Sequence, residues 1–380
     1  MVYLYPYDVI CMNEFKRLES LDALRGFDML FIMGFASLVT AVCSLFPNGS
    51  ESWLSEQMGH VAWNGLRHHD TIFPLFLFIA GISFPFSYAK QCEKGASRLS
   101  IYGKIFRRGV VLFLLGLVCN GLFRLHLDTI RICSVLGRIG LAWMFAALIY
   151  INFKPKARAV IAAVVLLGYW FLCMIPAPDV PGGDPLSKEG CLVGYIDRIV
   201  LGPDHLYSGK IFDPEGLLST VPAIVTAMLG MFTGDFVRLP EQKLSGNRKT
   251  LYMFAAAAVM LVAGLVWSNW FPINKKLWTS TFVLVVGAYS LAMFALFYWI
   301  IDVKGWNKWT LFFKVIGMNS ITIFLAPRLI SFGQATNFLM GGVIELCPEQ
   351  IGRIIYLVTY LALSWLFLYF LYKKKIFLKV

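Results

Sequence analysis

The side chains best suited to chemistry near neutral pH are five histidines, all in segments predicted to lie on the same side of a membrane. They are His60, His68, His69, His126 and His205. Three of them lie in one short stretch, GHVAWNGLRHHD. Imidazole changes its charge between about pH 5 and 8, so this placement predicts proton chemistry on that side of the membrane.

The stretch around His60 also holds the partners that a general base needs. An amide (Asn64) and a carboxylate (Asp70) follow it, and such groups fix the tautomer of a nearby imidazole. His68 and His69 are adjacent, so their side chains point in different directions. The residues leave open which histidine accepts a proton, or whether each is only a solvated loop residue. No metal is expected, because the spacing matches no standard ligand pattern.

Charged side chains also occur at the start of, and inside, apolar runs. Asp22, Arg25 and Asp28 are spaced at i, i+3 and i+6, which places them on nearly one helical face. Either Arg25 binds an anionic ligand, or an Asp–Arg pair only fixes the helix in the membrane. Arg138 lies inside an apolar run and needs a partner, for which Asp22 and Asp28 are the candidates.

The longest predicted loop, 178–215, carries a second polar set. Its acidic and imidazole side chains are candidate ligands of a polar substrate such as a sugar: Asp197, Asp204, His205 and Glu215. Glu215 also suits the N-terminus of the following helix, which is the simpler interpretation of that residue. In the histidine stretch, Trp63 offers a face on which a sugar ring can stack.

The composition indicates which elements must position these residues. The chain of 380 residues is 58% hydrophobic and 15% charged, whereas soluble domains carry about 25% charged residues. Long apolar runs without short alternating segments predict helices rather than a barrel. We therefore expect an all-α polytopic bundle of about ten transmembrane helices. The predicted spans are 24–46, 71–90, 107–125, 134–152, 159–177, 216–236, 250–267, 280–300, 309–330 and 352–372.

Lysine and arginine alternate between rich and poor loops, and the rich loops are expected in the cytoplasm. Both termini then lie in the cytoplasm, in agreement with an even number of spans. The prediction is one transmembrane domain, 24–372, between a cytoplasmic segment, 1–23, and a basic tail, 373–380. The net charge of +12 is explained by topology signals, so the expected partner is the lipid bilayer and not nucleic acid.

Several motifs occur together in one order: SLDALRGFDM, HVAWNGL with FPLFLFIAG, GYIDRIVLG with DHLY, DPEGLLST, INKKLW, DVKG, GMNS and KKKIFLKV. In this order they resemble the catalytic membrane domain of the heparan-α-glucosaminide N-acetyltransferase family, from about Arg17 to Val380. The resemblance implies that acetyl-CoA is used from the cytoplasm and that the acetyl group crosses to the amine of a glucosamine. It also implies a bacterial inner-membrane enzyme, because the family has many bacterial members.

Within that resemblance, the essential histidine of the family matches His60, which favours His60 over His68 and His69. The active histidine is then near the extracytoplasmic side. An asparagine proposed as catalytic in the family is matched here by Ala36, which puts helper chemistry at that position in doubt. The expected acceptor contacts are Trp63, Asn64 and Asp70, together with the polar set of the long loop.

The expected mechanism places the nucleotide of acetyl-CoA at a basic inner mouth and its thioester near His60. The candidate cofactor-binding residues are Arg25, Arg107, Arg108 and Arg138. His60 acts either as a general base or as a carrier of the acetyl group. The alternatives are a transporter or flippase of a sugar or lipid-linked sugar, and an O-acyltransferase of envelope glycan. A homodimer is considered possible.

Overall fold

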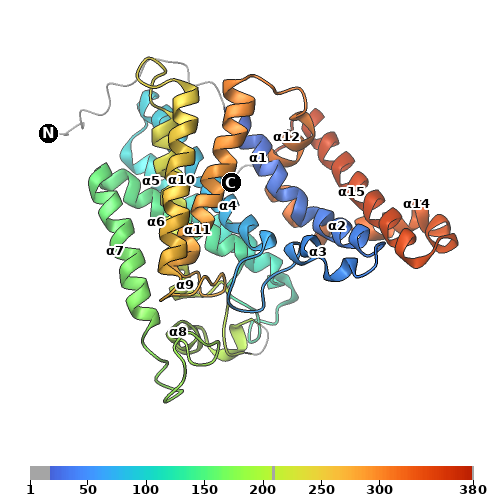
Figure 1. Cartoon of the computed structure of the whole chain (residues 1–380), viewed down its shortest axis with the longest axis horizontal. Coiled ribbons are helices and arrows are strands. Elements are labelled where there is room, and N and C mark those ends of the chain that lie inside the picture. Colours follow the sequence, from blue (N-terminus) through green and yellow to red (C-terminus); the bar gives the residue numbers. More distant parts are fainter. Residues whose placement is uncertain (1–17, 208–209, 379–380) are drawn as a thin grey trace.

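A computed structural model describes residues 18–207 and 210–378. In this part of the chain, helices joined by loops form one bundle, drawn in Figure 1. The α-helices are α1 (Glu19–Leu30), α2 (Ala36–Cys43), α3 (Trp53–Gln57), α4 (His68–Glu93), α5 (Arg98–Cys119), α6 (Val135–Asn152), α7 (Pro155–Cys173), α8 (Leu192–Leu201), α9 (Leu217–Val237), α10 (Gly246–Trp267), α11 (Ser280–Phe297), α12 (Leu311–Gly317), α13 (Ser320–Leu329), α14 (Phe332–Leu346) and α15 (Glu349–Lys373).

The all-α membrane bundle is confirmed, with fewer clear spans than the sequence predicted. In the described residues, 8 helices are long and apolar enough to cross a membrane, or up to 9 if the bent pair α12–α13 counts as one span. That pair bends by 67°. The other predicted span, 107–125, corresponds to α5, which begins at Arg98. α5 is 22 residues long, but Lys104, Arg107 and Arg108 make its first half too polar to count with the others.

The first span is interrupted by a π-helical turn. α1 continues through Phe31–Phe35 into α2, and Gly34 within this turn has φ 128°. A positive φ of this size suits glycine, which has no Cβ to clash with the backbone. Ala36, the position matched to the family asparagine, directly follows the turn. The interruption therefore breaks the regular helix immediately before Ala36.

The loops sort into two ends of the bundle, as the alternation of charge predicts. At one end, Tyr102 donates a hydrogen bond to Asn152 (2.6 Å), and the amide of Glu19 donates one to Asp302 (3.1 Å). At the other end, the indole of Trp63 donates to the carbonyl of Leu186 (2.8 Å). The segments that carry the histidines adjoin this second end, because His60 lies in the same loop as Trp63 and His205 contacts Ile130 in the loop that contains His126. The basic loops and the histidines therefore occupy opposite ends.

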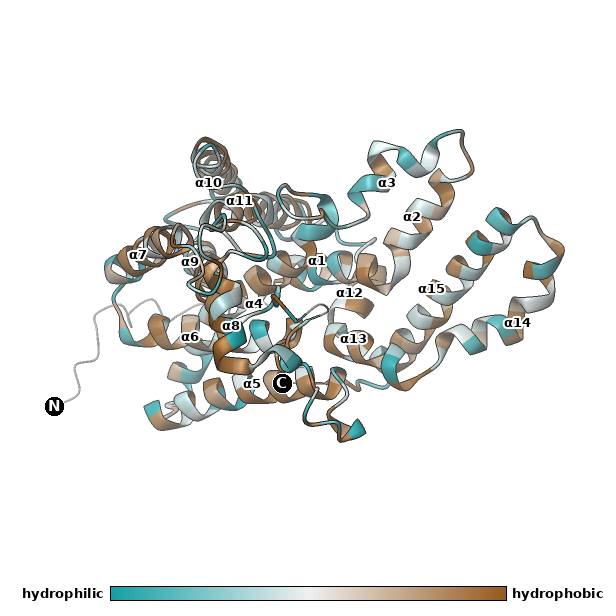
Figure 2. Cartoon of the chain, turned by 90° about the horizontal axis from the view of Figure 1, so that it is seen from below, coloured by the Kyte–Doolittle hydropathy of each residue, from teal (hydrophilic) through white to brown (hydrophobic). Residues whose placement is uncertain are grey.

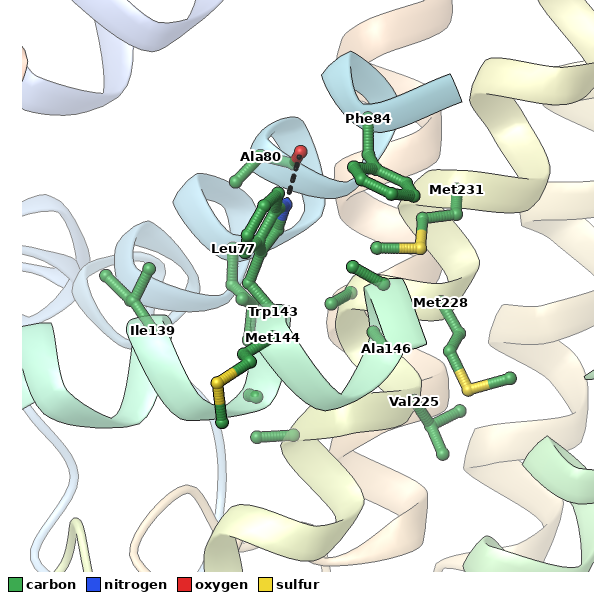
Figure 3. Packing of buried hydrophobic residues seen from close by; sticks show 14 of the residues in the cluster. Leu77, Ala80, Phe84, Ile139, Trp143, Met144, Ala146, Val225, Met228 and Met231 are labelled. Atoms are coloured by element: carbon green, nitrogen blue, oxygen red, sulfur yellow. Dashed lines mark hydrogen bonds between the residues drawn. The ribbon is translucent and has the colours of Figure 1, made fainter. Parts of the chain in front are cut away.

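The core is centred on the crossing of α4 and α9, where two glycines bring the backbones into contact. A Cβ added at Gly81 would lie 2.2 Å from the carbonyl oxygen of Ala227, and one at Gly230 would lie 2.1 Å from that of Phe78. Small residues permit this close approach in membrane bundles, where dispersion drives helix association. Figure 3 shows Trp143 of α6 beside this crossing, with its indole donating to the carbonyl of Ala80 (3.2 Å).

The outer faces of the bundle are apolar. α7, α10 and α15 expose large apolar side chains, including Val259, Leu251 and Leu366. Figure 2 shows apolar residues along the outward faces of α7 and α10. Such faces are expected where helices contact lipid tails rather than water. α15 packs on α2 and on α14, and the α14–α15 pair extends from one side of the bundle (Figure 1).

The glycine contact between α4 and α9 gives a test of the fold. We expect Gly81→Ala to lower the free energy of unfolding by about 1–3 kcal/mol, because its methyl group overlaps the backbone of α9. The melting temperature of the purified protein in detergent measures this loss. The control is Gly168→Ala in α7, where an added Cβ meets nothing within 4 Å. Equal melting temperatures for the two variants would contradict the close approach.

Candidate active site

His60 and Asp70 form the centre of the candidate site. The Nδ1 atom of His60 lies 2.7 Å from Oδ1 of Asp70. The His60 side chain is 53% exposed, whereas that of Asp70 is 1% exposed. A buried carboxylate that accepts from Nδ1 orients the ring and leaves Nε2 for a substrate. The predicted pairing of His60 with a carboxylate is present in the structure.

The position of Asp70 follows from the start of α4. Its Oδ2 accepts hydrogen bonds from the amides of Arg67 (3.1 Å) and Val61 (3.3 Å). Asp70 is the third residue of the helix, and a carboxylate there also complements the positive end of the helix dipole. The local sequence RHHD thus fixes the carboxylate, and the carboxylate fixes the loop that carries His60.

A distant loop, 268–279, closes the site from the other side. Lys275 places its Nζ 3.3 Å from Oδ1 of Asp70 and 3.2 Å from Nδ1 of His60. Lys276 donates to the carbonyl of Ala62 (2.5 Å). Asn274 donates to the side chain of Asn64 (3.0 Å), which fixes the predicted amide of the histidine stretch. These contacts hold the two loops together over the N-terminus of α4.

The two adjacent histidines diverge as predicted. The rings of His69 and His60 are 4.7 Å apart between centroids. His68 instead packs on Phe31 and lies 3.2 Å from the hydroxyl of Tyr289. Only His69 therefore joins His60 directly.

A cavity of about 310 Å³ opens beside His69. It is lined by Phe31, Ile32, Gly34, Ala36, Ser37, Thr40, Met58, His69 and Arg353. The π-helical turn of the first span thus forms one wall of it. Ala36 and His69 share this cavity, so the position of the family asparagine lies next to the histidine cluster. The volume falls at the lower end of the range for small-molecule sites.

The arginines predicted to bind the cofactor lie at different places in the structure. Arg25 lies 3.6 Å from Asp22 and donates weakly to Ser83 (3.4 Å). Arg108 stacks on the ring of Trp143, 4.1 Å from its centroid, and its charge repels that of Arg25. Arg107, the preceding residue of α5, is exposed. Two of the predicted arginines therefore come together.

Arg138 does not join them, and its predicted pairing with Asp22 or Asp28 is wrong. Arg138 lies one turn inside the start of α6, where it donates to Ser219 of α9 and faces the ring of Trp278 at 4.9 Å. The reason is tertiary packing: α6 contacts α9 closely, so the side chain reaches the N-terminus of that helix first. This places Arg138 toward the histidine end of the bundle, away from the predicted inner mouth.

The polar set of the long loop is mainly structural. Glu215 and Asp213 both accept from Arg131, which binds Asp213 at 2.6 Å. Asp197 accepts from the amide of Leu217 at the start of α9 (2.8 Å). These contacts are structural, and the substrate contacts of these carboxylates stay predictions.

Asp204 and His205 lie apart from His60. Asp204 pairs with Lys210 on the surface, and Nδ1 of His205 lies 2.8 Å from the carbonyl of Ile130. Trp63 is half-buried, with its indole committed to Leu186 and its ring against Phe212. Of the residues predicted to contact the acceptor, Asn64 and Asp70 are therefore the two that take part in the hydrogen bonds around His60.

Comparison with known proteins assigns the chain to a family. A model of the catalytic region of heparan-alpha-glucosaminide N-acetyltransferase matches residues 17–251. The chain belongs to this family. It is 28% identical over 417 residues to heparan-alpha-glucosaminide N-acetyltransferase of Homo sapiens and 29% identical over 423 residues to that of Mus musculus. Each alignment covers 96% of this chain, and the chain spans 60% and 61% of the length of these two relatives.

Lys275 contacts His60 and Asp70, a role that the sequence alone does not predict. The INKKLW motif contributes to the family resemblance, but the resemblance assigns no role to its lysines. Two adjacent lysines in a loop on the cation-poor side were a usable signal, because charge there needs a reason other than topology. What the sequence did not show is that Lys275 reaches Asp70, which is 205 positions earlier in the chain.

Asp197 gives a pH-dependent test of the structural interpretation. Burial raises its pKa from the usual 3.8 to about 7, mainly because the charged form loses water. A raised pKa in the fold means that the protonated form is favoured, so stability falls as pH rises from about 4 to about 7. We expect the stability of Asp197→Asn to decrease less than that of the wild type as the pH rises. The melting temperature between pH 5 and pH 8 measures this. A variant with the same pH dependence as the wild type would contradict the assignment.

Proposed function

We propose that this chain is an acetyl-CoA-dependent N-acetyltransferase with both termini in the cytoplasm. It transfers the acetyl group of cytoplasmic acetyl-CoA to the amine of a glucosamine-type sugar on the opposite side of the membrane. The observation that carries the proposal is the His60–Asp70 pair, with Nδ1 engaged at 2.7 Å and the ring partly open to solvent. Family membership supports the reaction type, because the relatives carry that name.

The chemistry follows from which imidazole nitrogen is free. With Nδ1–H donating to Asp70, Nε2 accepts a proton from the sugar ammonium, and the neutral amine attacks the thioester carbonyl. The C–N bond forms, the C–S bond breaks, and CoA leaves as the thiol. In the second route, Nε2 attacks the thioester first and passes the acetyl group to the amine. Mass spectrometry of the enzyme with acetyl-CoA and no acceptor distinguishes the two routes.

Arg25 and Arg108 support the proposed binding of acetyl-CoA at the basic end of the bundle. Arg108 is held on Trp143 with its Nε unpartnered in the described residues, and the repulsion from Arg25 is relieved when an anion lies between them. The phosphates of CoA supply such anions. Both arginines lie toward the basic end of the bundle, so the pantetheine arm has to extend along the bundle to reach His60.

The acceptor end is supported by the cavity beside His69. Its wall includes Ser37 and Thr40, whose hydroxyls suit the hydroxyls of a sugar. Ala36 occupies the wall where the family has an asparagine, so an amide contact with the substrate is replaced here by a methyl group. We propose that the acceptor amine enters between this cavity and Nε2 of His60.

The central prediction concerns His60. We expect His60→Ala to lower kcat/KM for acetyl transfer about 10²–10⁴-fold, because it removes the base, while binding of CoA stays unchanged. The assay uses reconstituted vesicles with acetyl-CoA on one side and glucosamine on the other. The control is His126→Ala, an exposed histidine at the same end of the bundle. Full transfer by His60→Ala would reject the assignment, and transfer that needs both substrates on one side would reject the transmembrane geometry.

A second prediction separates the two neighbouring arginines. We expect Arg108→Met to raise KM for acetyl-CoA about tenfold or more, because a charged hydrogen bond to phosphate contributes about 1.5–3 kcal/mol. KM for the sugar should not change. The matched control is Arg107→Met at the exposed neighbouring position, which should leave both constants near the wild-type values. Steady-state kinetics with each substrate varied in turn provides the measurement. Equal effects of the two substitutions would contradict an anion site at Arg108.

A further inference from the structure

Lys275 occupies an unusual place for a lysine. Its Nζ lies 3.2 Å from Nδ1 of His60 and 3.3 Å from Oδ1 of Asp70, so the three side chains form a closed triangle. The side chain is only 18% exposed, although it belongs to a loop outside the spans. Lysine usually keeps its ammonium in water, and a position with so little water needs a compensating partner.

The carboxylate of Asp70 does not need Lys275 to complete its hydrogen bonds. It already accepts from the amides of Val61 and Arg67 and from the ring of His60. Burial lowers the pKa of Lys275, and the charge of Asp70 acts in the opposite direction. The lysine is therefore held at an electrostatic cost beside a carboxylate that is already satisfied. This points to a role in the charge of the site rather than in its folding alone.

The two charges act on the His60 ring with opposite signs. A carboxylate in contact with imidazole favours the imidazolium, and an ammonium in contact disfavours it. Because Lys275 lies beside Asp70, the net charge of these two neighbours of the ring is zero.

We propose that Lys275 is a positioning residue that offsets the charge of Asp70 and so keeps His60 available as a neutral base. This inference rests on the proposed acetyl transfer through His60. Lys275 itself takes no acetyl group in this role. It sets the pH range over which the ring can accept a proton, and it holds loop 268–279 against the His60 loop.

The remaining charged and titratable groups around His60 do not replace this contact. Arg67 donates to the backbone carbonyl of His60 (3.3 Å) and lies 3.9 Å from Glu56, so its charge is partly balanced. The ring of His69 meets that of His60 edge-on, at 4.7 Å between centroids. Lys276 is bound to the carbonyl of Ala62.

Two further charges act on Lys275 from a greater distance. Glu215 and Arg138 influence it with opposite signs and no direct contact. Among the described residues, Lys275 is therefore the cation that touches both the ring and the carboxylate. Changing this residue alone should alter the pH response of the site.

The experiment compares pH profiles of kcat/KM for four forms of the full-length enzyme in vesicles. The variants are Lys275→Gln, Lys275→Arg and Lys276→Gln, beside the wild type. We expect Lys275→Gln to move the acidic limb of the profile up by about one pH unit, because one contacting charge is lost. Above that limb its rate should stay within a few-fold of the wild type. Lys275→Arg keeps the charge and should keep the limb, as should Lys276→Gln.

An unchanged limb in Lys275→Gln would overturn the inference, and so would an upward shift of the same size in Lys275→Arg. If Lys275→Gln fails to fold, as judged by its melting temperature, Lys275→Met provides the same charge removal with a more apolar side chain. If neither neutral variant folds, a role in charge alone is overturned in favour of a structural one. His60→Ala in the same assay separates the two claims: full activity there removes the proposed function itself, whereas loss there with an unchanged Lys275→Gln profile removes only this inference.

Discussion

The buried carboxylate of Asp70 is the constraint on which the site depends. An ionised carboxylate without water is costly unless its oxygens are satisfied, and here four donors from three segments supply that. The donors come from the His60 loop, from the first turn of α4 and from loop 268–279. One charge thus fixes the orientation of the imidazole and joins two loops that are far apart in the chain.

The bundle provides a rigid base for this charge. α4 carries Asp70 at its first turn, and a few turns further its glycine face meets α9 at backbone contact. The same α9 begins beside Asp197 and Arg138, whose side chains bind its first turn. The polar groups of the long loop therefore stabilise the helix that supports α4.

How far the sequence could predict these features depends on the range of each interaction. His60 and Asp70 are ten positions apart, and their pairing could be predicted from residue type and spacing. Most helices could also be predicted, because a span needs one long apolar run. The partner of Arg138 could not, since it is chosen by the packing of α6 on α9 rather than by helical spacing. The contact of Lys275 could not be predicted for the same reason. The contact of Asp197 with Leu217 could not be predicted either, because buried structural carboxylates and ligand-binding ones look alike in a sequence.

The interruption at Phe31–Phe35 shows how a defect in regular structure can be useful. A regular helix would keep its backbone groups and side chains closed against its neighbours, whereas the turn at Gly34 leaves room for the cavity beside His69. Ala36, the position matched to the family asparagine, lines that cavity. Differences between family members at this position can therefore change the cavity wall without changing the bundle.

The triangle of His60, Asp70 and Lys275 also has a consequence for biosynthesis. Its members are separated by as many as 215 positions, and seven of the α-helices named above lie wholly between the first and the last of them. A nascent chain has to insert most of its helices before the imidazole meets both of its charged neighbours. Premature termination or a failed insertion step anywhere upstream of loop 268–279 leaves the histidine without its lysine, so the triangle forms only after most of the helices have been inserted.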